Sequence, residues 1–166
     1  ALRPRIGAVG ARLIYASGLV QHAGVILGVG GFAGHAHRFA HPGDWGYLGR
    51  LQAQQHYAAV TAACLVVERD KFLAVGGFDA EAFPVAYNDV DLCLRLRAAG
   101  FQTLWTPYAE LLHKESASRV KDYSAERRLD YDRESQALLD RWGSLVADDP
   151  CYHPALSRTQ ENFSLE

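Results

Sequence analysis

Methionine is absent from the 166-residue sequence, even at the initiator position. We therefore expect the chain to be a piece of a longer polypeptide. Cysteine is scarce, because only Cys64, Cys93 and Cys151 occur, an odd number without the spacing of a metal site. This pattern argues against a disulfide framework and favours reduced thiols, so we expect a cytoplasmic location.

An excess of positive charge and long apolar runs are also lacking. The formal net charge is -2 and no segment concentrates basic residues, so the sequence does not predict binding to nucleic acid. No apolar run approaches the roughly 18 residues that a membrane helix needs, and no signal peptide opens the chain. What is present, 49% apolar and 22% charged residues, is typical of a globular protein. The length suits a single domain, residues 1–166, with one core that buries roughly 70% of the unfolded surface.

Strand signals dominate the first half of the chain. Residues 6–15 and 19–27 are extended runs around a turn and predict a β-hairpin or two neighbouring strands. Residues 28–49 are rich in glycine and predict a long surface loop. The apolar run 58–67 favours a buried strand, and residues 68–75 favour a short helix that ends at a pair of glycines.

A second helix is expected from Asn88 to Gly100. Asn88 can cap the first turn, and Asp91 lies three residues further on, as in a capping box. Asp91 is thereby predicted to bind backbone at the helix start.

The last part of the chain predicts two strand pieces, a helix and a tail. Residues 101–105 and 109–113 are aromatic and aliphatic runs on either side of a proline. Residues 124–142 carry a helical apolar stripe, and residues 147–166 are expected to form an irregular tail. Strands that alternate with helices predict an α/β domain, with a mixed sheet flanked by helices.

Four segments, in this order, resemble family 2 glycosyltransferases of the GT-A type, and in particular rhamnosyltransferase-like members. They are Val9 to Leu13 with Gln21 to Val25, Gly76 to Asp79, Asn88 to Arg95, and His113 to Arg119. The resemblance spans nearly the whole chain and implies a partial GT-A domain, the C-terminal, acceptor-side half of the catalytic domain. The family's preceding nucleotide-binding half, with its Asp-x-Asp metal motif, is missing. We therefore expect this segment alone to be inactive.

The resemblance assigns Asp89 as the catalytic base of an inverting sugar transfer. Asp89 and Asp91 form an Asp-x-Asp string, but they open a helix and so do not match the family's metal motif. The family has a Glu-Asp pair here, and Asn88 replaces the glutamate. Chemically, one carboxylate suffices to take the proton from an attacking hydroxyl. The alternative is that Asp89 only complements the helix dipole.

The resemblance also assigns a diphosphate end of the site. His113 follows an apolar run, and in many GT-A enzymes a histidine here completes the coordination of a divalent ion, Mn²⁺ or Mg²⁺. We expect that ion in the longer parent protein, and weak or absent binding in this fragment. Ser116, Ser118 and Arg119 are donors suited to phosphate oxygens. The alternative for His113 is that its ring only forms hydrogen bonds with the backbone. The alternative for the other three residues is that they belong to an ordinary polar loop.

The acceptor end is assigned to the Gly76-Gly77-Phe78-Asp79 turn and to Asp91. The lack of a side chain at Gly77 would let the backbone approach a sugar, and the ring of Phe78 could stack on that sugar. Asp79 and Asp91 could bind its hydroxyl groups. A helix end followed by a turn also explains both glycines. A further trio, residues 35, 37 and 41, is histidine throughout, but its spacing does not fit a structural zinc site.

The sequence thus predicts the acceptor-binding, base-bearing part of a glycosyltransferase. We expect its partners to be a nucleotide-sugar donor and a saccharide or polysaccharide acceptor, and we expect self-association through the surface that the missing half covers. For the parent protein we also consider a location at the inner face of the membrane. The alternatives are a carbohydrate-binding or interaction module without transfer activity and, less well supported by the residues, an unrelated hydrolase that uses Asp89.

Overall fold

A mixed β-sheet built around β1 (Ile6–Ile14) forms the centre of the protein. The computed structural model describes residues 1–114 and 125–165. β7 (Gln102–Leu112) pairs in parallel with β1 along its whole length, from Ile6 to Ile14. The antiparallel strands β2 (Val20–His22) and β6 (Leu65–Val67) therefore share the other edge of β1. β5 (Gln55–Tyr57) pairs with β7 and completes the five strands. The predicted α/β class, the mixed sheet and the first hairpin are confirmed.

The two strand pieces predicted around Pro107 belong to one strand. Ala11 pairs with Thr106, and its neighbour Arg12 pairs with Glu110, so residues 107–109 form an irregularity in β7. A proline lacks the N–H that a ladder requires, and a bulge is where a sheet tolerates it. Both runs are extended as predicted, and they belong to one strand that continues through this irregularity.

The predicted strand over residues 58–67 was wrong in most of its length. Ala58, Ala59 and Val60 are buried but lie outside the named strands, and the 3-10 helix η3 (Ala62–Cys64) follows them. Within the run, Ala59 forms an isolated antiparallel bridge with Val25, and β6 pairs with β1. Residues 58–60 are buried whereas Val66 is 58% exposed, so this short apolar run predicted neither its burial nor its conformation throughout.

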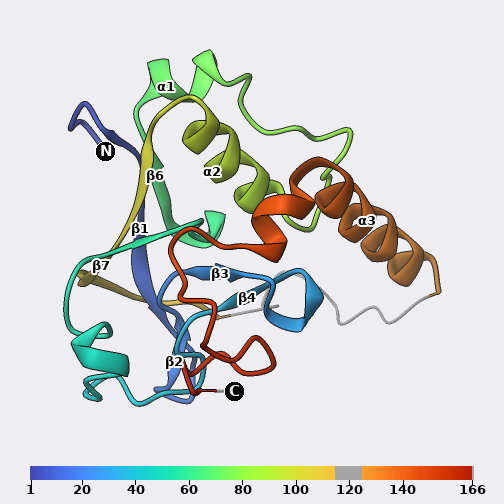
Figure 1. Ribbon diagram of the computed structural model, residues 1–166. Helices are drawn as coiled ribbons and strands as arrows, with labels where there is room; N and C mark the ends of the chain where they lie inside the picture. The colour runs from blue at the N-terminus through green and yellow to red at the C-terminus, as the bar shows by residue number, and fades with distance from the viewer. Residues whose placement is uncertain (115–124, 166) are drawn as a thin grey trace.

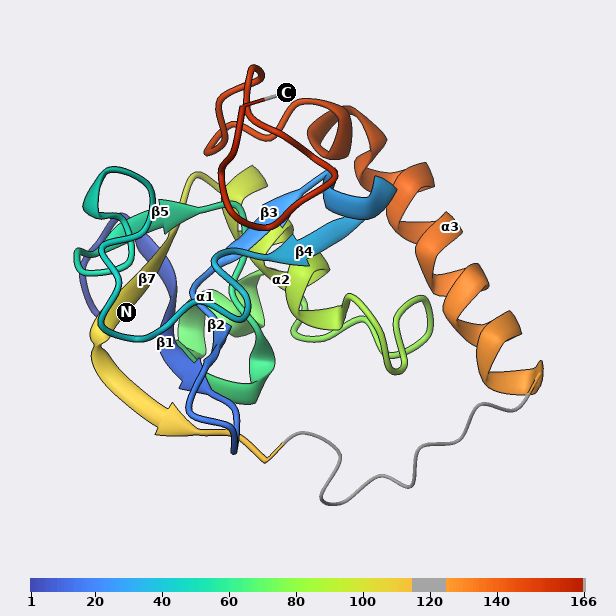
Figure 2. The same cartoon turned by 90° about the horizontal axis from the view of Figure 1, so that it is seen from below.

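Two helices lie where the sequence predicted them, α1 (Arg69–Ala74) and α2 (Asn88–Ala98). In both views of the molecule α2 lies between the main sheet and the long helix α3 (Ala125–Ala147) (Figures 1 and 2). This position explains why most of α2 is buried. α3 continues beyond the predicted end at residue 142, and its predicted start at residue 124 lies outside the described residues. None of the described helices is long and apolar enough to cross a bilayer.

The predicted cap of α2 was wrong. The residue before the helix is Tyr87, in the left-handed conformation at φ 58°, and no side chain caps the helix. The carboxylate of Asp91 binds the side chains of Arg95, Arg141 and Trp142. Because these partners hold both of its oxygens, Asp91 cannot form a capping box.

A second sheet, separate from the main one, has two strands. β3 (Val25–Leu27) pairs with β4 (Ala33–His35), with the short helix η1 (Val29–Gly31) between them, and η2 (Tyr47–Gly49) follows. The predicted loop 28–49 thus holds a short strand. The chain passes from β2 to β3 through Gly24, which has φ 110° and whose absent Cβ would lie 2.2 Å from the Tyr57 ring. Only glycine fits there.

Residues 148–165 are irregular, as predicted, but they pack against the body of the protein. Tyr152, Leu156 and Phe163 are buried in the core. Asp149 accepts a hydrogen bond from the Leu27 backbone on β3 at 2.8 Å. In Figure 1 this segment (red) passes in front of β3 and β4. The end of the chain therefore helps to position β4.

Candidate functional site

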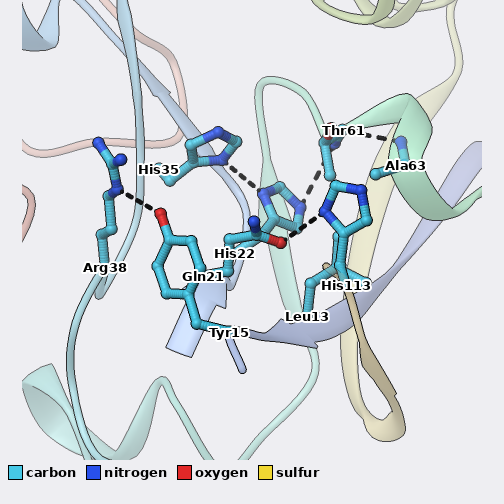
Figure 3. A pocket seen from close by; sticks show the side chains of 9 residues that line it. All are labelled: Leu13, Tyr15, Gln21, His22, His35, Arg38, Thr61, Ala63 and His113. Carbon is cyan, nitrogen blue, oxygen red and sulfur yellow. Dashed lines mark hydrogen bonds between the residues drawn. The ribbon is translucent and has the colours of Figure 1, made fainter. Parts of the chain in front are cut away.

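Two cavities share the side chains of His35 and Thr61. The first, of about 300 Å³, is called here the histidine cavity, and the second, of about 470 Å³, the aspartate cavity. The histidine cavity is lined by Leu13, Tyr15, Gln21, His22, His35, Arg38, Thr61, Ala63 and His113 (Figure 3). The aspartate cavity is lined by Val25, Ala33, Gly34, His35, Thr61, Val85, Ala86, Tyr87, Asn88, Asp89, Val90 and Tyr131. Asp89 thus lines one cavity and His113 the other, and the two cavities have two lining residues in common.

His113 lies at the end of β7 and is half-buried. Its Nδ1 lies 2.7 Å from Oε1 of Gln21, the middle residue of β2. An amide oxygen accepts only, so this contact places the His113 proton on Nδ1 and leaves the lone pair on Nε2. An imidazole prepared in this way can accept a hydrogen bond or bind a metal ion.

A buried pair of histidines forms the back of the histidine cavity. His22 is fully buried, and its Nδ1 lies 2.8 Å from Nδ1 of His35 (Figure 3). The other ring nitrogen of His22 accepts a hydrogen bond from the backbone N–H of Thr61 at 3.4 Å. Burial, and then the charge of His35, lower the pKa of His22 well below its usual value. His22 is therefore neutral at physiological pH.

Donors dominate the rest of the histidine cavity. The guanidinium of Arg38 donates to the hydroxyl of Tyr15 at 2.9 Å. Of the described residues, those that line this cavity include no carboxylate, whereas those that line the aspartate cavity include Asp89. The described linings of the two cavities therefore differ in their charged groups.

Asp89 is the second residue of α2, and it is half-buried at the wall of the aspartate cavity. One carboxylate oxygen accepts a hydrogen bond from the backbone N–H of Ala62 at 2.8 Å, and the other accepts from Val90 at 2.9 Å. These donors fix the plane of the carboxylate. Each oxygen has a second lone pair for a further donor.

Helix α3 holds the loop that leads into Asp89. The buried carboxylate of Glu134 accepts hydrogen bonds from the backbone of Val85 at 2.9 Å and of Ala86 at 2.6 Å. The hydroxyls of Tyr87 and Tyr131 lie 2.6 Å apart. A left-handed conformation is unusual for a bulky residue such as Tyr87, so these contacts help to maintain it.

The predicted acceptor residues lie elsewhere. Asp91 is fully buried in ion pairs with Arg95 and Arg141, so no carboxylate oxygen is open to a sugar. Asp79 accepts from the backbone of Ala82 at 3.0 Å and pairs with Arg141 at 2.8 Å. These contacts, the backbone bond first, hold the pKa of Asp79 below its usual value.

The turn before Asp79 is part of the same network. The carbonyl of Gly77 accepts from Arg95 at 2.6 Å, and Phe78 packs edge-on against Phe72. Neither residue lines the two cavities. The contacts of Gly77, Phe78, Asp79 and Asp91 therefore support a structural role, and their acceptor-binding role stays a prediction without support.

The predicted phosphate ligands Ser116, Ser118 and Arg119 lie outside the described residues. Among residues 1–114 and 125–165, no group of three or more histidine, cysteine, aspartate or glutamate side chains could hold a metal ion. His113 is thus one candidate ligand, and the described part of the chain does not complete a metal site.

The sequence analysis missed Gln21, His22 and Thr61 as site residues. It weighed His35 only within a zinc trio. The segment that contains Gln21 and His22 belonged to the resemblance, but no role was attached to it. Histidine in a predicted extended run of mainly apolar residues, as at His22 in the run 19–27, is a signal that could have been followed.

Comparison with known proteins relates the whole chain to much longer proteins. It is 48% identical over 166 residues to the protein y4gI of Sinorhizobium fredii, and 39% identical over 174 residues to the O-antigen biosynthesis protein RfbC of Myxococcus xanthus. The chain spans only 18% and 13% of the length of these relatives.

A shorter match, 41% identical over 63 residues, relates 38% of the chain to 20% of the N-acetylglucosaminyl-diphospho-decaprenol L-rhamnosyltransferase of Mycobacterium tuberculosis. No family model and no solved structure matches the chain. The names of the relatives point to a glycosyltransferase-like family that acts in the biosynthesis of sugar polymers.

Proposed function

We propose that this chain is the acceptor-side part of an inverting glycosyltransferase of the GT-A type in family 2, with Asp89 as its general base. The observation that carries the proposal is that Asp89 and His113 line adjoining cavities with a shared wall. The donor would be a nucleotide-activated sugar and the acceptor a saccharide. Relatives named for O-antigen biosynthesis and rhamnosyl transfer support this substrate class.

The two cavities suit the two ends of an inverting displacement. The acceptor hydroxyl must attack the anomeric carbon from the side opposite the departing diphosphate. Asp89 in the aspartate cavity can take the hydroxyl proton, because a carboxylate oxygen held by one backbone donor retains a lone pair for a second. The histidine cavity, whose lining includes Arg38 and His113 and no carboxylate among residues 1–114 and 125–165, would take the negatively charged leaving group.

His113 belongs to the diphosphate end in this proposal. With its proton on Nδ1, its Nε2 is available to a divalent ion or to a phosphate-bound proton. A divalent ion would neutralise charge on the leaving group. Its other ligands would come from outside the described residues, and we propose that a longer parent protein supplies them together with the nucleotide site. The free cysteines accord with a cytoplasmic reaction.

The test is an acceptor-dependent assay of nucleoside diphosphate release in the longer protein that contains this chain. Asp89→Asn should lower turnover by about 10² to 10⁴ with donor affinity little changed, because general-base catalysis contributes about that much. Asp70→Asn is the matched control, since Asp70 is the exposed second residue of α1. Full turnover of a folded Asp89→Asn protein would refute the assignment. Binding of saccharide without any transfer would favour a carbohydrate-binding module.

A further inference from the structure

Helix α3 contributes an aromatic side chain to the cavity that contains Asp89. Tyr131, in the second turn of α3, lines the aspartate cavity together with Tyr87 and Asp89. The hydroxyls of Tyr131 and Tyr87 lie 2.6 Å apart, although 44 positions separate the two residues along the chain. Their ring centroids lie 5.7 Å apart, with the planes inclined by 40°. The lining of this cavity therefore combines two tyrosine rings with a carboxylate.

The two tyrosines differ in how much of each is open to solvent. Tyr87 has the ring of Phe32 as a second aromatic neighbour, with the centroids 6.3 Å apart. Burial, and then the hydrogen bond with Tyr131, raise the pKa of Tyr87 above its usual value. Tyr131, in contrast, is 47% exposed. Tyr87 is thus held by its protein neighbours, whereas part of Tyr131 is open to a ligand in the cavity that it lines.

The lining of the aspartate cavity favours a neutral ligand that has both apolar and polar groups. Val25, Val85 and Val90 supply apolar side chains, and Asp89 supplies a carboxylate. The volume of about 470 Å³ lies within the usual range of small-molecule sites. A saccharide has this mixed character, because C–H groups lie on the faces of its ring and hydroxyls lie around the rim. The carboxylate can accept from a hydroxyl, and it repels an anion such as a diphosphate.

We propose that the ring of Tyr131 stacks on the acceptor saccharide and thereby orients the hydroxyl from which Asp89 takes the proton. The negative face of an aromatic ring attracts the weakly positive C–H groups of a pyranose, so the stack fixes the plane of the sugar. This inference rests on the proposed function, because it gives the acceptor of that reaction a binding surface. Tyr131 is a specificity-determining residue, and Tyr87 is a positioning residue that acts through the contact between the two hydroxyls.

The first test is binding of simple pyranosides to the longer protein, which needs no transfer activity. The probes are the methyl glycosides of glucose, galactose, N-acetylglucosamine and rhamnose, observed by saturation-transfer NMR with irradiation of the aromatic protons. We expect at least one probe to bind, with the strongest transfer to C–H groups on one face of its ring. Tyr131→Ala should remove this pattern, and Tyr131→Phe should keep it. Tyr108→Ala is the matched control, because Tyr108 is 78% exposed and lies outside both cavities.

The second test separates a stacking role from a merely structural one by affinity. Tyr131→Ala should raise the dissociation constant of the bound pyranoside about tenfold, the size of one good aromatic contact, with the KM for the nucleotide-sugar unchanged. Tyr131→Phe and Tyr87→Phe lose only the hydroxyl contact, so each should stay within about threefold of the wild type. The double phenylalanine variant should bind no more weakly than either single one, because both substitutions remove the same hydrogen bond.

Any of three results overturns the proposal: no probe binds the wild-type protein, Tyr131→Ala binds as tightly as Tyr108→Ala, or Tyr131→Phe binds as weakly as Tyr131→Ala. These outcomes are separate from failure of the proposed function. If Tyr131→Ala loses affinity as expected while Asp89→Asn keeps full turnover, the saccharide site stands and the base assignment fails. If Asp89→Asn loses turnover while Tyr131→Ala binds like the control, the base stands and the role of Tyr131 fails.

Discussion

Asp89 at the start of α2 accepts a 2.8 Å hydrogen bond from the backbone N–H of Ala62 at the start of η3. This bond ties the helix that carries the proposed base to the segment that carries Thr61, which is part of the wall between the two cavities. Asp89 therefore has a structural role as well as a proposed chemical one. The two roles can be separated, because they depend on different properties of the carboxylate.

Stability should respond only weakly to Asp89→Asn. The asparagine oxygen can accept from either Ala62 or Val90 but not from both, so about 1 kcal/mol of unfolding free energy should be lost. Asp89→Ala loses both bonds and should cost about twice as much. Urea denaturation of the two variants beside Asp70→Asn measures this. A loss several times larger for Asp89→Asn would mean that its effect on turnover reports misfolding.

His113→Ala should affect the donor more than the acceptor. In the longer protein we expect weaker metal-dependent binding of the nucleotide-sugar and lower turnover, since His113 is proposed to act at the diphosphate. Gln21→Leu should give a smaller change in the same direction, roughly 10-fold to 100-fold at most, because Gln21 only orients the ring of His113. Kinetics at varied Mn²⁺ and varied donor concentration would distinguish these effects. An unchanged metal dependence in His113→Ala would contradict the assignment.

Asp91→Ala should destabilise the fold. The carboxylate is fully buried between Arg95 and Arg141, and removal of one partner from a buried ion pair typically costs about 3 to 5 kcal/mol. Asp132→Ala is the control, an exposed carboxylate on α3. Thermal or urea unfolding measures the difference. If Asp91→Ala folds with normal stability but binds the acceptor weakly, the acceptor-binding prediction would regain support.

Helix positions were predictable from the sequence, and their caps were not. The sequence predicted α2 where the structure has it, although the capping residues on which the prediction rested do not cap the helix. Its first turn depends on Tyr87 and on Glu134, which is almost 50 residues away, and no local pattern contains that contact. Of the run 58–67, only residues 58–60 are buried, so its apolar composition predicted neither burial nor strand structure over its whole length.

The candidate site, like the fold, could be predicted from the sequence only in part. Asp89 and His113 were found through segments that resemble a known family, and the fold places both at adjoining cavities. The pair His22 and His35 could not be derived, because its members lie on strands of different sheets and meet only after those sheets pack. The contacts of Asp91 could not be derived for a related reason, since Arg141 and Trp142 reach it from a distant helix.

Glu134→Ala tests whether α3 positions the proposed base. The substitution leaves the backbone N–H groups of Val85 and Ala86 without their acceptor, which should cost about 2 to 4 kcal/mol. The loop before Asp89 should loosen, so turnover in the longer protein should fall even at temperatures where the variant is folded. Asp132→Ala again serves as the control on the same helix. Equal turnover of the two variants would show that the loop contact does not influence Asp89.

The free energy of unfolding should fall as the pH is lowered from about 6.5, the ordinary histidine pKa, toward 4. Burial, and then the positive charge of Arg50, lower the pKa of His37 to about 4. The unfolded chain therefore takes up a proton in this window while the folded protein does not, and protonation favours unfolding. For a buried group this gap corresponds to at most roughly 3 kcal/mol. The lowered pKa of His22 acts in the same direction.

His37→Gln isolates the contribution of His37. Its ring stacks on Phe163, and its buried Nε2 has no hydrogen-bond partner among the described residues, so protonation there has no compensating contact. The glutamine variant should be less stable at neutral pH but should lose less stability between pH 6.5 and 4 than the wild-type protein. His41→Gln, at an exposed histidine, should keep the wild-type slope. Urea denaturation at several pH values measures all three slopes, and identical slopes for His37→Gln and the wild type would exclude His37 as the source.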